Sequence, residues 1–124
     1  MLKQRQGQRA ERAAEGLLRE AGLRLIERNF SCKMGEIDLI MRDRSAHQGP
    51  ILVFVEVRYR ASGRFGGAAA SITPVKQRRI VNSARRFLQR YRRYASWPCR
   101  FDVVAVTGSN DRLELNWVRG AFDC

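Results

Sequence analysis

Residues 35–60 have the sequence GEIDLIMRDRSAHQGPILVFVEVRYR and contain the two clearest strand patterns in the chain. Polar and apolar side chains roughly alternate over residues 35–42, and residues 51–60 are almost wholly apolar up to Glu56. A polar loop over residues 43–50 separates them, so we predict two strands joined as a hairpin. Because the second strand is apolar on both faces, we expect it at the centre of a sheet.

The hairpin is expected to bring two acidic side chains together. Its loop is centred near position 46.5, so that paired positions sum to about 93 and Asp38 falls opposite Glu56 or one residue away. Directly opposed Cβ atoms lie about 5 Å apart. Two such carboxylates repel each other unless a cation compensates them, which favours a divalent metal. Alternatively, Glu56 pairs with Arg58 or a neighbouring arginine, and Asp38 is a solvated acid at a strand end.

The segments on either side of the hairpin complete an α/β pattern. We predict a helix over 8–21, a strand over 23–30, a helix from Pro74 to about Tyr94, and strands over 100–107 and 112–118. Thr73 before Pro74 fits a helix N-cap, and the glycine-rich residues 62–70 fit a loop. The expected fold is one domain over residues 1–124, with a central mixed sheet flanked by helices in the order α-β-β-β-α-β-β.

Charge is concentrated in one part of the chain. The net charge is +12, from 24 basic and 12 acidic residues among 124. All the acidic residues lie outside residues 57–101, whereas that segment contains half of the basic ones. A local excess of this kind indicates a polyanionic partner such as nucleic acid rather than general solubility.

The predicted second helix has one apolar face and one basic face. On a helical wheel, seven arginines share the face away from the core: Arg78, Arg79, Arg85, Arg86, Arg90, Arg92 and Arg93. With no acidic residue to offset their repulsion, they favour phosphate binding over a merely solvated face. Lys76 is the exception, because it lies on the packed side. It either extends its ammonium to solvent or brings that ammonium to a phosphate.

The first helix contributes a third candidate acid. Glu11 lies at the edge of the apolar stripe, and Glu15 lies further toward solvent, so Glu11 is the better candidate to reach the sheet. Alternatively, Glu11 is an ordinary acid near a helix N-terminus, where it favours the helix dipole.

Several classes of protein do not fit the sequence. The N-terminus lacks the apolar region of a signal peptide, and the longest apolar run, Ile51–Val55, is far too short to span a membrane. We therefore expect a cytoplasmic protein with no membrane partner. Three cysteines without a CxxC pair and a single histidine argue against a disulfide framework or a zinc site. A metal would be held by carboxylates and carbonyls, as Mg²⁺ or Mn²⁺ is.

Several sequence blocks together resemble a known family. They are Gly7-x3-Glu11, Gly22, Asn29-Phe30, residues 35–40 (GEIDLI), residues 53–58 (VFVEVR), Thr73-Pro74-x-Lys76, residues 100–104 (RFDVV) and Ala121-Phe122. Together they resemble the YraN-like family of bacterial proteins over nearly the whole chain. That family in turn resembles archaeal Holliday-junction resolvases and the wider PD-(D/E)xK nuclease superfamily, which implies a restriction-endonuclease-like fold.

The resemblance also implies roles for individual residues. Asp38, Glu56 and the backbone carbonyl of Val57 match the metal ligands of the superfamily, and Glu11 matches the helix acid of its resolvase-like members. Position 58 departs from the pattern, because the usual lysine is Arg58. Arginine stays charged under ordinary conditions, so Arg58 can stabilise a transition state but cannot act as a general base. Water activation would then fall to the metal. Lys76 is a candidate for a nearby ammonium, although no pattern of the superfamily assigns it that role.

We therefore expect a Mg²⁺- or Mn²⁺-dependent endonuclease that binds DNA and hydrolyses phosphodiesters at Asp38 and Glu56. Branched DNA is the substrate implied by the resolvase resemblance, and junction cleavage would call for a homodimer. The alternative is a catalytically inactive module of the same fold that binds DNA or RNA, with the arginine at position 58 marking the loss of activity. A further alternative is a factor that binds RNA or associates with ribosomes.

Overall fold

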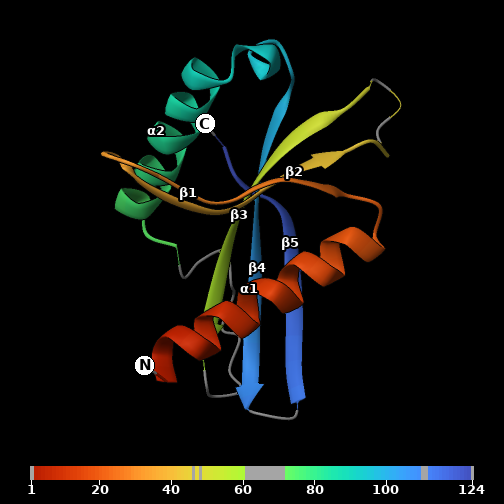
Figure 1. The fold of residues 1–124 in the computed structure, drawn as a ribbon, viewed down its shortest axis with the longest axis vertical. Helices are drawn as coiled ribbons and strands as arrows, with labels where there is room; N and C mark the ends of the chain where they lie inside the picture. Colours follow the sequence, from red (N-terminus) through yellow and green to blue (C-terminus); the bar gives the residue numbers. More distant parts are fainter. Residues whose placement is uncertain (1, 46, 48, 61–71, 110–111, 124) are drawn as a thin grey trace.

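The structure is a computed structural model that describes residues 2–45, 47, 49–60, 72–109 and 112–123 (Figure 1). Along the chain it contains α1 (Leu2–Glu20), β1 (Arg24–Cys32), β2 (Gly35–Asp43), β3 (Ile51–Arg60), α2 (Pro74–Arg90), the short 3-10 helix η2 (Arg92–Tyr94), β4 (Cys99–Ser109) and β5 (Arg112–Phe122). The loop predicted over residues 62–70 lies outside the described residues. In the described part of the chain, no helix is both long and apolar enough to cross a membrane.

The five strands form one mixed sheet in the order β1-β2-β3-β4-β5. Only β3 and β4 run parallel, and the other neighbours are antiparallel. The central position of β3 confirms the prediction from its apolar sequence. Figure 1 shows β1 and β2 running across the view while β3, β4 and β5 run along it, so the sheet is strongly twisted.

The two helices cover opposite faces of the sheet (Figure 1). Successive side chains of β3 alternate between these faces, because side chains along a strand point to opposite sides. Val53 and Val55 join the core beneath α1, whereas Leu52 and Phe54 join the core beneath α2. Burial on both faces explains why this strand is almost continuously apolar.

The hairpin of β2 and β3 has the predicted pairing within one residue. Paired positions sum to 94, from Asp43 with Ile51 to Leu39 with Val55. Beyond that last pair the two strands separate. The first residues of β2 pair only with β1, and the last residues of β3 pair only with β4. We call the point of separation the strand fork.

The second helix is shorter than predicted. It ends at Arg90, because Tyr91 adopts the non-helical angles φ −117° and ψ 79° while its N–H still donates to Phe87 O at 2.8 Å. This turn allows the Tyr94 ring to be buried against the Phe87 ring, with 5.8 Å between their centroids. Arg92 and Arg93 therefore lie on η2, and placing them on the helical face with the other arginines was wrong.

Several other elements extend beyond their predicted ranges, whereas β3 has the predicted range Ile51–Arg60. α1 begins at Leu2 rather than at residue 8, and β5 continues to Phe122 rather than to residue 118. The longer β5 is explained by packing, because the Phe122 ring stacks on the Phe101 ring of β4 with 5.0 Å between the centroids.

A buried charge cluster holds β2, β4 and β5 together. Arg100 Nε and Nη2 donate to Asp102 Oδ1 and Oδ2 at 2.9 and 3.0 Å, and Arg100 Nη1 donates to Asp43 Oδ2 at 3.1 Å. Trp117 Nε1 also donates to Asp102 Oδ2. Counting Arg100 in the basic segment therefore overstated the positive surface, since this guanidinium is turned inward and its charge is offset.

Candidate metal centre and nucleic-acid interface

Asp38 and Glu56 lie on the two sides of the strand fork, one residue beyond the last pair of the β2–β3 ladder. The Val57 N–H, which has no ladder partner in β2, donates to Asp38 Oδ2 at 2.8 Å. A side-chain oxygen therefore continues the link between the strands where the backbone ladder stops. The two carboxylates that the sequence places opposite each other do interact in the structure.

The environment of Asp38 favours its protonated form. Burial raises the pKa of Asp38 to about 8, with a further contribution from the negative charge of Glu56 and an opposing one from the Val57 N–H. Glu56 is itself buried, with 6% of its surface exposed. The buried Glu56 and the partly buried Asp38 therefore share a site that lacks enough positive charge for both carboxylates.

Lys76 supplies part of that positive charge from the first turn of α2. Its Nζ lies 2.8 Å from Glu56 Oε2. The helix is positioned by its predicted cap, in which Thr73 Oγ1 accepts from the Lys76 backbone N–H at 3.2 Å, with Pro74 at the first helical position. The prediction that Lys76 points toward the sheet is confirmed, and Glu56 pairs with this lysine rather than with an arginine.

A cleft of about 500 Å³ opens above the carboxylates, between the start of β2, the end of β3 and the first turns of α2. Its lining residues are Gly35, Glu36, Asp38, Glu56, Val57, Thr73, Val75, Lys76, Arg79 and Ile80. Acidic residues lie on the strands, and both cations lie on the helix. A phosphate in this cleft would meet Lys76 and Arg79 on one side and the carboxylates on the other.

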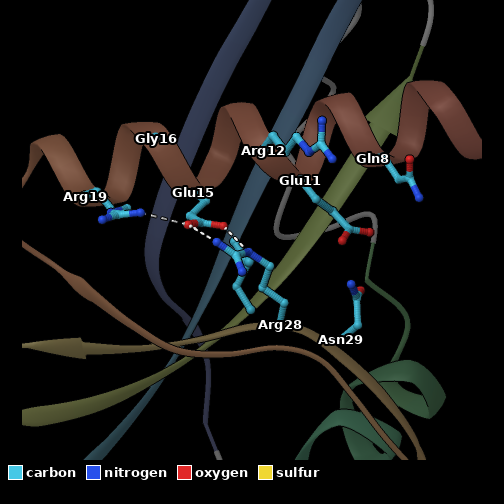
Figure 2. A pocket seen from close by; sticks show the side chains of 9 residues that line it. Gln8, Glu11, Arg12, Glu15, Gly16, Arg19, Arg28 and Asn29 are labelled. Atoms are coloured by element: carbon cyan, nitrogen blue, oxygen red, sulfur yellow. Dashed lines mark hydrogen bonds and ion pairs between the residues drawn. The ribbon is translucent and has the colours of Figure 1, made fainter.

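Glu11 approaches the same region from the other face of the sheet. It lines a second groove of about 570 Å³ between α1 and β1, in which its side chain points toward Asn29 (Figure 2). Burial raises the pKa of Glu11, as do the nearby charges of Glu36 and Glu56, and a hydrogen bond with Asn29 opposes this rise. Glu11 therefore contributes to the negative potential at the strand fork.

Glu15 differs from the prediction, since it is more buried than Glu11. It is 6% exposed and accepts from Arg28 Nε and Nη2 at 2.7 and 2.9 Å and from Arg19 Nη1 at 3.3 Å (Figure 2). Hydrogen bonds from Arg28 lower the pKa of Glu15, so it stays ionised inside an ion-pair cluster. The helical wheel ranked Glu15 as the outer residue because it does not include this arginine from β1.

Arg58 is not brought to the cleft as closely as Lys76. It lies on β3 opposite Ala105 of β4 and is partly buried. It is not among the residues that line the cleft, and it makes no hydrogen bond or ion pair with any residue that the structure describes. Lys76, in contrast, contacts a candidate metal ligand.

The donor set at the strand fork is small. Among the described residues, no group of three or more His, Cys, Asp or Glu side chains is arranged to hold a metal. Asp38 and Glu56 supply two carboxylates, and Mg²⁺ commonly binds one or two carboxylates together with water and substrate phosphate. A divalent cation would also relieve the repulsion that raises the pKa of Asp38. The pair therefore fits a substrate-assisted Mg²⁺ or Mn²⁺ site better than a closed protein cage.

The predicted arginines are all exposed, but they fall into two groups. Five lie on α2, and of these Arg79 lines the cleft while Arg85, Arg86 and Arg90 line a groove beside it. The other two lie on η2, where Arg93 Nη2 donates to the Tyr94 hydroxyl at 2.8 Å. The basic surface thus begins at the carboxylates and continues along α2.

The raised pKa of Asp38 predicts a specific dependence of stability on pH. The folded protein binds this proton more tightly than the unfolded chain does, so this contribution is complete below about pH 4 and is lost as the pH rises toward about 8. We expect the unfolding free energy, measured with urea in EDTA, to decrease from about pH 5 to about pH 8 in the wild type. The decrease should be smaller in Asp38→Asn, which lacks this titrating carboxyl. The same decrease in both proteins would contradict this role of Asp38.

The sequence matches the model of the family described as "Uncharacterised protein family UPF0102" over residues 10–106. It is 48% identical over 120 residues to a UPF0102 protein of Stutzerimonas stutzeri, covering 97% of this chain and 96% of that protein. It is also 49% identical over 116 residues to a UPF0102 protein of Nitrosococcus oceani, covering 94% of this chain and 90% of that protein. Since the match spans most of the domain and both sides of the strand fork, the chain belongs to the UPF0102 family, the YraN-like family that its sequence blocks resemble.

Proposed function

We propose that this protein is a divalent-metal-dependent endonuclease with a PD-(D/E)xK-type fold that binds DNA through α2. The observation that supports this most is the Asp38–Glu56 pair at the strand fork, where β2 and β3 separate beneath a cleft that also contains Lys76 and Arg79. A buried and a partly buried carboxylate that lack enough positive charge, next to cations that line the same cleft, are suited to bind a metal and a phosphodiester together.

Asp38 and Glu56 would hold the cation, with the Val57 carbonyl as a backbone ligand. When bound, Mg²⁺ or Mn²⁺ would lower the pKa of a water and stabilise negative charge on the phosphate. The Val57 N–H orients Asp38 through its 2.8 Å hydrogen bond. Glu11 increases the negative potential from the α1 side, which favours cation entry.

The cations of the site would act on the phosphodiester. The Lys76 ammonium contacts Glu56 and lines the cleft, so it would contact a phosphate bound there instead. Arg79 lines the same cleft. Arg58 is charged and has no partner among the described residues, so it can contact a neighbouring phosphate or the transition state. Neither arginine would act as a base, because a guanidinium cannot be deprotonated under ordinary conditions.

The exposed arginines of α2 would provide most of the DNA affinity. We expect the double variant Arg79→Ala with Arg86→Ala to weaken binding to all DNA sequences alike and to reduce the slope of log affinity against log salt by about 1.8, since each phosphate contact contributes about 0.9. Fluorescence anisotropy across a salt series in EDTA measures both quantities. Arg24→Ala with Arg112→Ala removes two exposed arginines from β1 and β5 and serves as the matched control. Equal losses in both double variants would contradict an interface on α2.

Activity on a panel of substrates tests the proposed function. Purified protein is incubated with four-way junction, flap, duplex and single-stranded DNA and with RNA, each with Mg²⁺, Mn²⁺ or EDTA. We expect cleavage of DNA that requires the metal, with branched DNA as the preferred substrate if the protein acts as a dimer like the resolvases. Tight, salt-sensitive binding without cleavage under any metal would instead support a binding module without catalysis. Two observations favour that alternative: arginine replaces the usual lysine at position 58, and the described residues supply only two carboxylates for a metal at this site.

A further inference from the structure

Exposed large apolar side chains are rare on this protein and lie close to its basic surface. Among the side chains that the structure describes, they are Met34, Val75 and Tyr91, with 54%, 52% and 37% of their surface exposed. Val75 lines the cleft, Met34 lines the adjacent groove, and Tyr91 directly follows a residue of that groove. Isolated exposed apolar residues need no explanation, but their coincidence with one charged surface does.

The groove beside the cleft is strongly basic. It has a volume of about 660 Å³ and lies between the turn that follows β1 and the outer side of α2. Its lining includes the four cations Lys33, Arg85, Arg86 and Arg90 and no carboxylate. We call it the basic groove. Its charge favours a polyanion, and Met34 gives it one strongly apolar contact point.

The cleft and the basic groove form one path along α2. Five residues of this helix recur at intervals of three or four and therefore share one face: Val75, Arg79, Asn82, Arg86 and Arg90. The first two line the cleft, and the other three line the basic groove. At 1.5 Å per residue this face is about 22 Å long, which is enough for several consecutive phosphates of one strand.

Tyr91 directly follows Arg90, the last residue of this path, and 37% of its surface is exposed, although it does not itself line the basic groove. Its ring centroid lies 4.7 Å from that of Phe87, whose own ring packs against Phe30 at 5.3 Å, so the tyrosine is fixed in position. Duplex DNA presents phosphates outward but keeps its base faces stacked. An aromatic or apolar side chain in a basic groove gains most from bases that are unpaired.

We propose that the basic groove binds an unpaired DNA strand, with phosphates on Arg85, Arg86 and Arg90 and bases against Met34 and Tyr91. This inference rests on the proposed DNA-binding function and specifies the substrate, which would contain a single-stranded segment next to the cleavage site. A strand that leaves the cleft at Arg79 meets the basic groove on the next turns of the same helix.

Binding to single-stranded and duplex DNA tests this inference. Oligonucleotides of about 20 nucleotides, single-stranded or annealed to their complement, are titrated by anisotropy in EDTA. We expect the wild type to bind the single strand at least as tightly as the duplex. Met34→Ser and Tyr91→Leu should each lower affinity for the single strand by about 5- to 100-fold, and affinity for the duplex by less than about two-fold. Tyr91→Leu keeps an apolar side chain against Phe87 and so preserves the fold.

The controls separate this inference from the proposed function. Tyr59→Leu makes the same exchange on the α1 side of the sheet and should leave single-strand affinity unchanged. If the wild type binds duplex DNA but Met34→Ser and Tyr91→Leu do not weaken single-strand binding, the inference is overturned and the proposed function stands. Equal losses for single strand and duplex would also overturn it, because the side chains would then not act on bases. If the wild type binds neither DNA, the proposed function itself fails.

Discussion

Asp38→Asn and Glu56→Gln should each lower metal-dependent DNA cleavage by about 10³-fold, which corresponds to about 4 kcal/mol in transition-state stabilisation. Each change keeps the shape of the side chain and removes the negative charge that would hold the cation. In EDTA, DNA affinity should be retained in Asp38→Asn, because burial already favours the neutral form of this carboxyl. It should be retained or increased in Glu56→Gln, which removes a repulsive charge next to the phosphate path. Initial cleavage rates on the preferred substrate, measured together with anisotropy, separate the two effects.

Glu114→Gln is the matched control for these carboxylate variants. Glu114 is an exposed acid on β5, outside the cleft and both grooves, and we expect cleavage within about two-fold of the wild type. If Asp38→Asn and Glu56→Gln cleave at the wild-type rate while the protein remains metal-dependent, the metal lies elsewhere and the proposed centre is wrong.

Arg100→Ala should destabilise the fold by about 3–5 kcal/mol, because it leaves two buried carboxylates without their shared cation. Asp43 and Asp102 are 2% and 0% exposed, and Arg100 bonds both. This loss is a large part of the roughly 5–15 kcal/mol that stabilises a typical domain, so the variant should be partly unfolded at moderate urea concentrations. Urea unfolding followed by tryptophan fluorescence measures the change.

Arg19→Ala is the comparison for Arg100→Ala. Arg19 also pairs with a buried acid, but its side chain is 61% exposed, and Arg28 still bonds that acid after the change. A cost below about 1 kcal/mol is therefore expected. Similar costs for the two variants would show that the Arg100 cluster contributes no more than a surface ion pair.

Much of the fold follows from local patterns in the sequence. The apolar run of β3, the alternation in β2 and the Thr73-Pro74 start of α2 are properties of adjacent residues, so the sequence predicts these elements with nearly their observed boundaries. The end of α2 was predicted incorrectly because the Tyr91 turn depends on burying Tyr94 against Phe87, which is a tertiary contact. In the sequence, the helical spacing of polar and apolar residues continues through Arg92 and Arg93, although the backbone leaves the α-helix at Tyr91.

The sequence predicts those residues of the candidate site that are placed by the register of two strands or by the face of one helix. Register places Asp38 opposite Glu56, and the wheel turns Lys76 inward, but neither pattern indicates that the two strands separate at this point. Pairings between distant elements, such as Glu15 with Arg28, leave no periodic signal. Asn29 is a similar case, since its left-handed φ of 52° is not indicated by its position within a strand.

Under the proposed function, the Lys76–Glu56 ion pair links two binding equilibria. In the free protein, the ammonium 2.8 Å from Glu56 Oε2 competes with any divalent cation for that oxygen. A DNA phosphate that attracts the ammonium away would free the oxygen, so metal affinity should rise when DNA is bound. By reciprocity, the metal must then increase DNA affinity by the same factor. The protein would hold its cation weakly until a substrate arrives, and cofactor and substrate would assemble the centre together.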